Sequence, residues 1–144
     1  MAANGPGGIM KRLASVTNAV TRDRDFSDEK LRPSLLIVDD EPDILDFLDI
    51  FFSSTYNVML ARSGEEALQL MVTEHFDCVL SDYSMPGMNG GELIRAIKSK
   101  YESVKTVLHS ASCPVEDLVA CDLQIAKPTG LSRIAELLYE LLAR

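Results

Sequence analysis

The stretch Leu35-Leu36-Ile37-Val38-Asp39-Asp40-Glu41-Pro42 places four consecutive apolar residues directly before an acidic turn. An uninterrupted apolar run is typical of a strand in a parallel sheet, because helices cover both faces of such a sheet. Pro42 suits the first turn of a helix. The residues expected on the apolar stripe of that helix are Ile44, Leu48, Phe51 and Phe52. The stretch therefore predicts the first strand and helix of an α/β fold.

The same alternation continues to the end of the chain. Further strands are expected at the short apolar runs 58–61, 78–81, 106–109 and 123–126. One helix is expected to begin at Ser63, where Ser63 and Glu66 form a capping box. The later helices are expected around Leu93, Ile94 and Ile97, at 115–120, and around Leu131, Ile134, Leu138 and Leu141. These units predict a single doubly wound, five-stranded parallel sheet with helices on both faces.

The N-terminal part of the chain differs from the rest. Residues 1–33 include Asn4-Gly5-Pro6-Gly7-Gly8 and show no sustained periodicity, which predicts a flexible leader with at most a weak helix at 9–20. One domain is expected at 34–144. Because the chain stops shortly after the last predicted helix, we expect a free-standing protein.

Composition excludes several classes of partner. The 144 residues are 47% hydrophobic and 25% charged, as in a soluble globular domain. No window approaches the roughly 18 apolar residues of a membrane span, and no signal peptide is evident, so a cytoplasmic protein without a membrane partner is expected. Residues 35–144 hold eight basic and eighteen acidic side chains. Such a domain would repel nucleic acid, so no direct nucleic-acid partner is expected.

Polar residues follow the predicted strands at the edge where an open parallel sheet carries its working site. They are Asp39, Asp40, Asp82, Ser110 and Lys127. Each residue alone has a structural explanation as a helix cap, a turn residue or a solvated charge. Together, three carboxylates at one edge repel one another unless a cation lies between them, and an all-oxygen set suits Mg²⁺. Lys127 and Ser110 then supply the charge and the hydroxyl donor that hold a phosphoryl group.

With these motifs in order, the chain resembles the receiver domains of bacterial response regulators, the CheY-like family of two-component signalling. The resemblance runs from about Leu35 to Leu142. The motifs that carry it are Leu36-Ile37-Val38-Asp39-Asp40-Glu41-Pro42, Ala61-Arg62-Ser63-Gly64-Glu65-Glu66-Ala67-Leu68, Leu80-Ser81-Asp82-Tyr83-Ser84-Met85-Pro86-Gly87-Met88-Asn89-Gly90 and Lys127-Pro128. The resemblance implies a flavodoxin-like fold and a receiver domain at 34–144.

The resemblance implies a role for each site residue, according to the position of that residue in the motifs. It implies that Asp82 is phosphorylated and that Ser110 and Lys127 contact the phosphoryl oxygens. The implied Mg²⁺ ligands are Asp39, Asp40, Asp82 and the backbone carbonyl of Ser84. The Lys127–Pro128 bond is expected to be cis.

The resemblance also implies partners. A sensor histidine kinase or a phosphotransfer protein would donate the group from a phosphohistidine, and an unidentified protein target would read the result by contact. The chain would not be an enzyme, because it would only catalyse its own phosphotransfer and dephosphorylation.

Two departures from the family pattern concern the output of the domain. Receivers usually carry an aromatic residue three positions before the lysine, where this chain has Gln124. The stretch from Ser110 to Lys127 is also four or five residues shorter than usual, so its helix should be short. These departures favour the main alternative, a pseudo-receiver that docks without being regulated by phosphorylation. A phosphatase with Asp82 as nucleophile is the weaker alternative, because no substrate cap is present.

A few further side chains invite a functional interpretation. His75 is expected in a solvated loop, and His109 is expected to point away from the Ser110 face into a helix-packing layer. Tyr83, next to Asp82, either gates the pocket or merely lies over it. The three cysteines are expected to be small core residues without disulfides: Cys78, Cys113 and Cys121.

Overall fold

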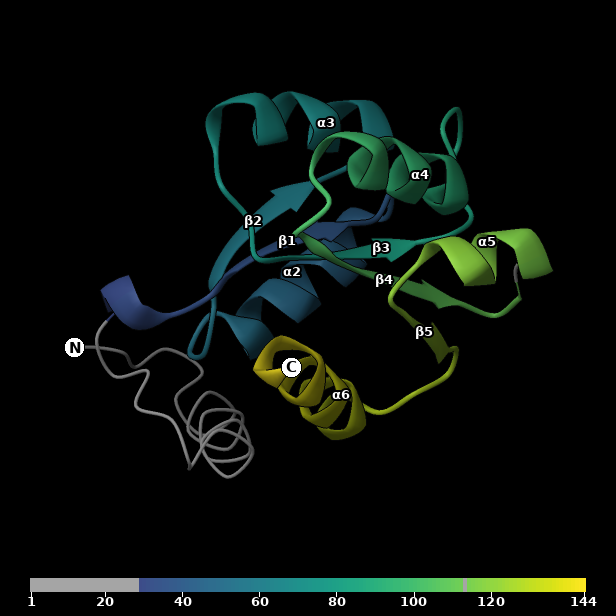
Figure 1. Ribbon diagram of the computed structural model, residues 1–144. Coiled ribbons are helices and arrows are strands. Elements are labelled where there is room, and N and C mark those ends of the chain that lie inside the picture. The colour runs from purple at the N-terminus through teal and green to yellow at the C-terminus, as the bar shows by residue number, and fades with distance from the viewer. Residues whose placement is uncertain (1–28, 113) are drawn as a thin grey trace.

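The computed structural model describes residues 29–112 and 114–144, which form a five-stranded sheet covered by helices (Figure 1). The strands are β1 (Ser34–Val38), β2 (Asn57–Ala61), β3 (Cys78–Asp82), β4 (Lys105–Ser110) and β5 (Leu123–Ala126). All neighbouring strands are parallel, and their order across the sheet is β2-β1-β3-β4-β5. The chain places β2 on one side of β1 and the later strands on its other side. This flavodoxin-like order confirms the predicted doubly wound sheet.

Helices lie on both faces of the sheet. They are α2 (Pro42–Phe52), α3 (Gly64–Thr73), α4 (Gly90–Lys100), α5 (Val115–Ala120) and α6 (Leu131–Ala143). Helices α2 and α6 pack on one face and α3 and α4 on the other, while α5 lies beside α4 near the β4–β5 edge (Figure 1). The short α5 has the bounds that the sequence predicts.

Strand β1 is buried on both faces, as its unbroken apolar run requires. Leu35 and Ile37 pack with the residues of α2 and α6, whereas Leu36 and Val38 pack with those of α3 and α4. This alternation follows from the two-residue period of a strand. The sheet therefore separates two apolar cores, and its central strands are fixed between them.

The apolar stripe of α2 differs from the prediction at one position. Leu45, Leu48, Phe51 and Phe52 are buried, whereas Ile44 is 39% exposed. Successive residues are turned by about 100° around a helix axis. A buried stripe centred on Leu45, Leu48 and Phe52 therefore leaves Ile44 at its margin, so the assignment of Ile44 to the core is wrong.

Only one half of the capping box predicted at the start of α3 is formed. The Ser63 hydroxyl accepts a hydrogen bond from the Glu66 backbone N–H at 3.0 Å, but the Glu66 carboxylate accepts from the Arg62 N–H instead of closing the box. A complete capping box, which the sequence analysis missed, occurs at α4. There Asn89 and Glu92 each accept from the other's backbone N–H, at 2.8 and 2.9 Å. This box fixes the start of α4 next to the loop that follows β3.

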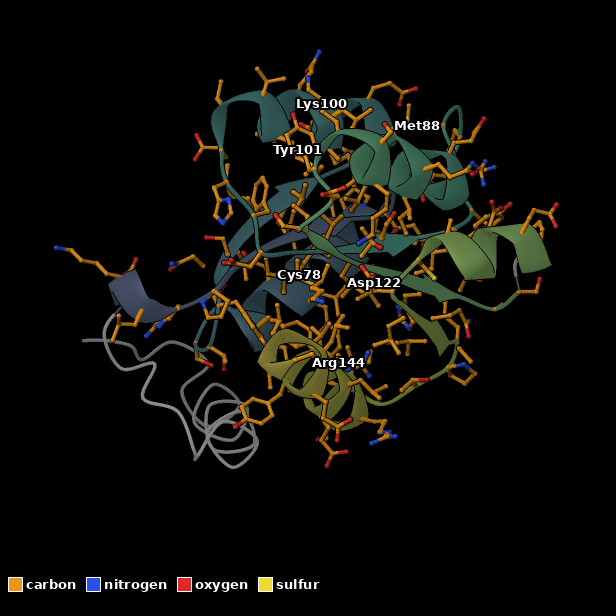
Figure 2. The ribbon with its side chains drawn as sticks, viewed as in Figure 1. Cys78, Met88, Lys100, Tyr101, Asp122 and Arg144 are labelled. Atoms are coloured by element: carbon orange, nitrogen blue, oxygen red, sulfur yellow. The ribbon has the colours of Figure 1, made fainter. Side chains whose placement is uncertain are left out.

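Cysteine burial agrees in part with the prediction. Cys78 is fully buried in β3 at the centre of the molecule (Figure 2), and burial raises the pKa of its thiol to about 12. Cys121 is half-buried, and Cys113 lies outside the described residues. Cys78 therefore behaves as a small core residue.

The N-terminal end of the described chain is held against the body of the domain. A 3-10 turn, η1 (Glu29–Leu31), precedes β1, and the Asn57 side chain donates to the Glu29 carbonyl at 3.0 Å. The predicted helix at 9–20 and the rest of the leader before Glu29 lie outside the described residues. Among the described helices, none combines the length and apolar character needed to cross a membrane.

Asp122, labelled in Figure 2, links β4 to α4 ahead of β5. Its Oδ2 accepts from the Thr106 N–H at 2.8 Å and lies 2.5 Å from Lys98 Nζ. Burial raises the pKa of Asp122, but the hydrogen bonds from Lys98 and Thr106 outweigh burial and hold it below its ordinary value. The carboxylate form therefore stabilises the fold.

We expect Asp122→Asn to lower the free energy of unfolding by about 1 kcal/mol at pH 7. A depressed pKa stabilises the fold above the unfolded-state pKa, and this contribution is lost as the pH falls through the folded-state pKa. The difference from the unsubstituted protein should therefore disappear at acidic pH in urea unfolding experiments. Glu102→Gln, on an exposed residue, is the control. A difference that does not change with pH would contradict the assignment.

Candidate functional site

The functional candidates meet at the carboxyl edge of the sheet because β1, β3, β4 and β5 are neighbours that all end there. Asp39 follows β1, Asp82 and Ser110 end β3 and β4, and Lys127 follows β5. One oxygen from each of Asp39, Asp40 and Asp82 lies within 4.8 Å of the others. The sheet thus brings Asp82 beside the adjacent Asp39 and Asp40, which lie far from it in the sequence.

The negative charges of the three clustered carboxylates repel one another. Asp39 is 3% exposed, and its pKa is raised, first by burial and further by the nearby charges of Asp82 and Asp40. The Glu41 N–H donates to Asp39 Oδ1 at 3.0 Å and offsets part of this effect, as does Lys127. A hard divalent cation bound by the cluster would remove the remaining repulsion, so the donor set fits Mg²⁺.

Lys127 faces the predicted phosphoacceptor. Its Nζ lies 3.0 Å from Asp82 Oδ1, and its backbone N–H donates to the Ser110 carbonyl at 3.0 Å. The Lys127–Pro128 bond is cis, as the resemblance implies. The side chain is only partly exposed, so its charge acts on Asp82 with limited screening by water.

Ser110, the last residue of β4, has a buried hydroxyl. The residue is 2% exposed, and its Oγ has no hydrogen-bond partner among the described residues. Buried hydroxyls normally have a partner, so Ser110 is poised to donate to an incoming oxygen. A phosphoryl group on Asp82 would supply such an oxygen.

The structural alternatives for two of these residues are wrong. The N-cap of α2 is Glu41 and not Asp40, and no side chain caps that helix. Helix α5 begins after Pro114, without a side-chain cap, so Ser110 does not cap it. Asp40 and Ser110 are therefore available for other roles.

The loop after β3 is shaped by glycines. Gly87 has a φ of +73°, which favours glycine. A Cβ on Gly90 would lie 2.4 Å from the Asp82 carbonyl oxygen and 2.8 Å from Tyr83 Cα. The first turn of α4 therefore packs directly on the backbone of the phosphoacceptor. Ser84 in this loop is exposed, and the role of its carbonyl as a Mg²⁺ ligand stays a prediction.

The two histidines take no part in the cluster of carboxylates. His75 is exposed in the turn before β3, as predicted, and its Nε2 lies 3.3 Å from Asp77 Oδ1. His109 is half-buried, and burial, followed by the charge of Lys127, lowers its pKa. The solvated position of His75 therefore accounts for it, whereas the Nε2 of His109 is buried and has no hydrogen-bond partner among the described residues.

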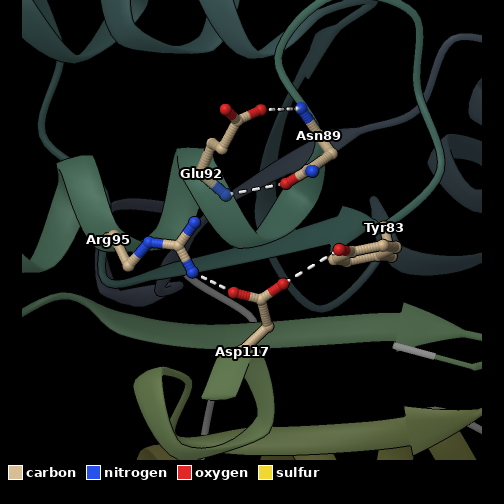
Figure 3. Close-up of polar contacts among 5 residues, drawn as sticks. All are labelled: Tyr83, Asn89, Glu92, Arg95 and Asp117. Atoms are coloured by element: carbon tan, nitrogen blue, oxygen red, sulfur yellow. Dashed lines mark hydrogen bonds and ion pairs between the residues drawn. The ribbon is translucent and has the colours of Figure 1, made fainter. Parts of the chain in front are cut away.

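A polar network beside the site was missed by the sequence analysis (Figure 3). Asp117, in α5, is 4% exposed and accepts a hydrogen bond from the Tyr83 hydroxyl at 2.9 Å. Its other oxygen pairs with Arg95 of α4. The Tyr83 side chain is thus hydrogen-bonded to helix α5. The only sequence signal for this network is the acidic pair Glu116-Asp117 in an otherwise apolar short helix.

We expect Ser110→Ala to leave the free energy of unfolding unchanged or to raise it by up to about 1 kcal/mol, because it removes a buried hydroxyl without a partner. The same change should weaken beryllofluoride binding in the presence of Mg²⁺, since one donor to the phosphoryl-like group is lost. Urea unfolding and fluoride-dependent thermal shifts measure the two effects. Ser99→Ala, on the exposed side of α4, is the control. Loss of stability without loss of beryllofluoride binding would assign Ser110 to packing alone.

Comparisons with known proteins agree with this geometry. The response regulator receiver domain family matches residues 35–136. The receiver domain of an HD domain-containing protein from Pseudomonas fluorescens is 26% identical, with a TM-score of 0.72 over 78% of this chain and 95% of that one. A CheY-like receiver domain from Methanospirillum hungatei is 28% identical, with a TM-score of 0.72 over 78% and 94%.

A third similar structure is that of a complex. The response regulator TrrA from Thermotoga maritima, solved in complex with Mg²⁺ and beryllofluoride, is 29% identical, with a TM-score of 0.69 over 76% of this chain and 98% of that one. The family match covers most of the folded region and includes the acidic cluster, Ser110 and Lys127. The chain belongs to the response regulator receiver domain family of two-component signalling.

Proposed function

We propose that this receiver is a phosphorylation-driven switch in which Asp82 accepts a phosphoryl group from a phosphohistidine donor in a Mg²⁺-dependent reaction. Receiver domains are phosphoacceptors and generally not true enzymes. The observation that carries the proposal is the 3.0 Å approach of Lys127 Nζ to Asp82 Oδ1 beside two further carboxylates. Such a switch would act in the cytoplasm and signal by contact with a target protein.

The transfer needs little covalent chemistry from the protein. One Asp82 carboxylate oxygen bonds to phosphorus as the P–N bond of the phosphohistidine breaks, and the imidazole leaves with the electron pair of that bond. The leaving ring is neutral when its other nitrogen carries a proton. Because Asp82 attacks as a carboxylate, no general base is needed, and catalysis rests on positioning and on charge neutralisation.

Each remaining site residue has a defined task in this proposal. Asp39, Asp40 and the carbonyl of Ser84 would hold Mg²⁺ together with Asp82, and the ion supplies positive charge to the transferring oxygens. Lys127 moves from the Asp82 carboxylate to a phosphoryl oxygen. Ser110 donates its unpartnered hydroxyl to another. Water later attacks phosphorus, breaks the acyl phosphate P–O bond and restores the carboxylate.

The surface of α2 suits a donor protein. Ile44, Phe47 and Ile50 are 39%, 54% and 45% exposed, and this helix begins two residues after Asp40. The acidic residues Asp43 and Asp46 are exposed on the same helix. A histidine kinase or phosphotransfer protein that presents apolar residues beside basic ones would bring its phosphohistidine to Asp82 across this helix.

Acetyl phosphate tests the proposal without a donor protein. With Mg²⁺, intact-protein mass spectrometry should show the addition of one phosphoryl group, and EDTA should prevent it. Inorganic phosphate, which lacks a leaving group, is the matched control and should give no modification. A protein that stays unmodified with acetyl phosphate and Mg²⁺ would instead support the pseudo-receiver alternative, for which Gln124 is the motivating residue.

A further inference from the structure

We propose that Asp117 is a positioning residue that couples the phosphorylation state of Asp82 to the position of α5, through the Tyr83 hydroxyl. The inference rests on the proposed phosphorylation of Asp82. The residues concerned, Tyr83, Asp117 and Arg95, are called the lateral bridge below (Figure 3). The bridge joins three elements: the loop after β3, helix α4 and helix α5.

The lateral bridge is built around a buried charge. Asp117 is 4% exposed, whereas the Arg95 side chain that pairs with it is half exposed. A buried carboxylate is stable only while its oxygens are paired, so the loss of one partner is costly. The Tyr83 hydroxyl at 2.9 Å is the partner on the side of the phosphoacceptor. Asp117 therefore responds to any displacement of Tyr83.

Helix α4 is shaped to admit this carboxylate. A Cβ on Gly91 would lie 2.4 to 2.7 Å from the carboxylate atoms of Asp117, so only glycine leaves room there. The preceding Gly90 donates its N–H to the Tyr83 carbonyl at 2.8 Å. The first turn of α4 thus touches both the backbone after Asp82 and the buried carboxylate of α5. These contacts leave little free space between the backbone after Asp82 and the carboxylate of Asp117.

Helix α5 is the element that can adopt a second arrangement. It has six residues and no side-chain cap at its first turn, so it depends on tertiary contacts for its stability. It is also joined to the site through the chain, because Ser110 lies seven residues before Asp117. A phosphoryl group that draws the Ser110 hydroxyl toward Asp82 pulls on the same connection that Asp117 anchors.

Strand β5 offers a weaker route for the signal. Gln124 Nε2 lies 3.5 Å from the Ser110 carbonyl, at the limit of a hydrogen bond. Ser110 and Lys127 are otherwise joined through a backbone hydrogen bond of the sheet, which is rigid. The lateral bridge, made of side chains, is therefore the more direct link from the site to a short helix that depends on tertiary contacts.

Hydrogen exchange of the α5 amides tests the coupling. In the unmodified protein, Tyr83→Phe should accelerate exchange at 115–120 by about five- to tenfold, because the hydroxyl no longer holds Asp117. Beryllofluoride with Mg²⁺ should accelerate the same amides in the unsubstituted protein and add little in Tyr83→Phe. Tyr101→Phe, which removes a hydroxyl at the far end of α4, is the matched control and should behave like the unsubstituted protein.

The outcomes separate this inference from the proposed function. Equal α5 exchange in Tyr83→Phe and the unsubstituted protein, both unmodified, would overturn the lateral bridge whether or not Asp82 is phosphorylated. If acetyl phosphate modifies Asp82 but beryllofluoride changes only β5 and α6, the coupling is overturned and the phosphoacceptor stands. Asp117→Asn, which keeps a side-chain acceptor for Tyr83, should lie between the unsubstituted protein and Tyr83→Phe.

Discussion

Asp82→Asn is expected to abolish modification by acetyl phosphate and Mg²⁺, while the unsubstituted protein gains one phosphoryl group. The amide has nearly the shape of the carboxylate but carries no charge and is a poor nucleophile. It also removes one of the three carboxylates that lie within 4.8 Å of one another, so Mg²⁺ should bind more weakly. The measurement is intact-protein mass spectrometry, followed by peptide mapping of the modified residue.

The control for this experiment is Asp43→Asn. Asp43 is exposed in the first turn of α2 and lies close in sequence to the cluster without belonging to it. This variant should be modified to the same extent as the unsubstituted protein. A phosphoryl group mapped to any residue other than Asp82, or a modified Asp82→Asn protein, would sink the assignment of the phosphoacceptor.

The fold and the main site could be predicted because both follow from periodicity and connectivity. Apolar runs such as the one in β1 identify buried parallel strands, and parallel strands that are neighbours all end at one edge. Asp39, Asp82, Ser110 and Lys127 are therefore brought together by the order of the strands, before any side-chain packing is considered. The 3.0 Å contact between Lys127 and Asp82 is a consequence of this order.

Features that depend on the rotation of a helix could not be predicted in this way. Ile44 and Leu45 are adjacent apolar residues, and packing against the sheet decides that Leu45 is the buried one. Asp117 lies on a helix of fewer than two turns, which is too short to show a period. Its burial against Gly91 arises from the way α5 meets α4. The lateral bridge is therefore visible only in three dimensions.

The acidic cluster should cost stability when no metal is bound, and Asp39→Asn should reveal this cost. Burial and the charges of Asp82 and Asp40 raise the pKa of Asp39, so its carboxylate form is disfavoured in the folded protein. The amide keeps an acceptor for the Glu41 N–H and carries no charge. We expect Asp39→Asn to raise the free energy of unfolding of the metal-free protein by about 0.5–2 kcal/mol, as is common when functional strain is relieved.

Mg²⁺ should reverse the order of stability of Asp39→Asn and the unsubstituted protein. In the unsubstituted protein, a Mg²⁺ concentration tenfold above the dissociation constant adds about 1.4 kcal/mol of stability by mass action. Asp39→Asn loses a ligand and should gain much less, so urea unfolding curves of the two proteins should converge or cross as Mg²⁺ is added. Asp46→Asn, on the exposed face of α2, should follow the unsubstituted protein at every Mg²⁺ concentration. If Asp39→Asn were less stable than the unsubstituted protein without metal and equally stabilised by Mg²⁺, Asp39 would be a structural residue and not a Mg²⁺ ligand.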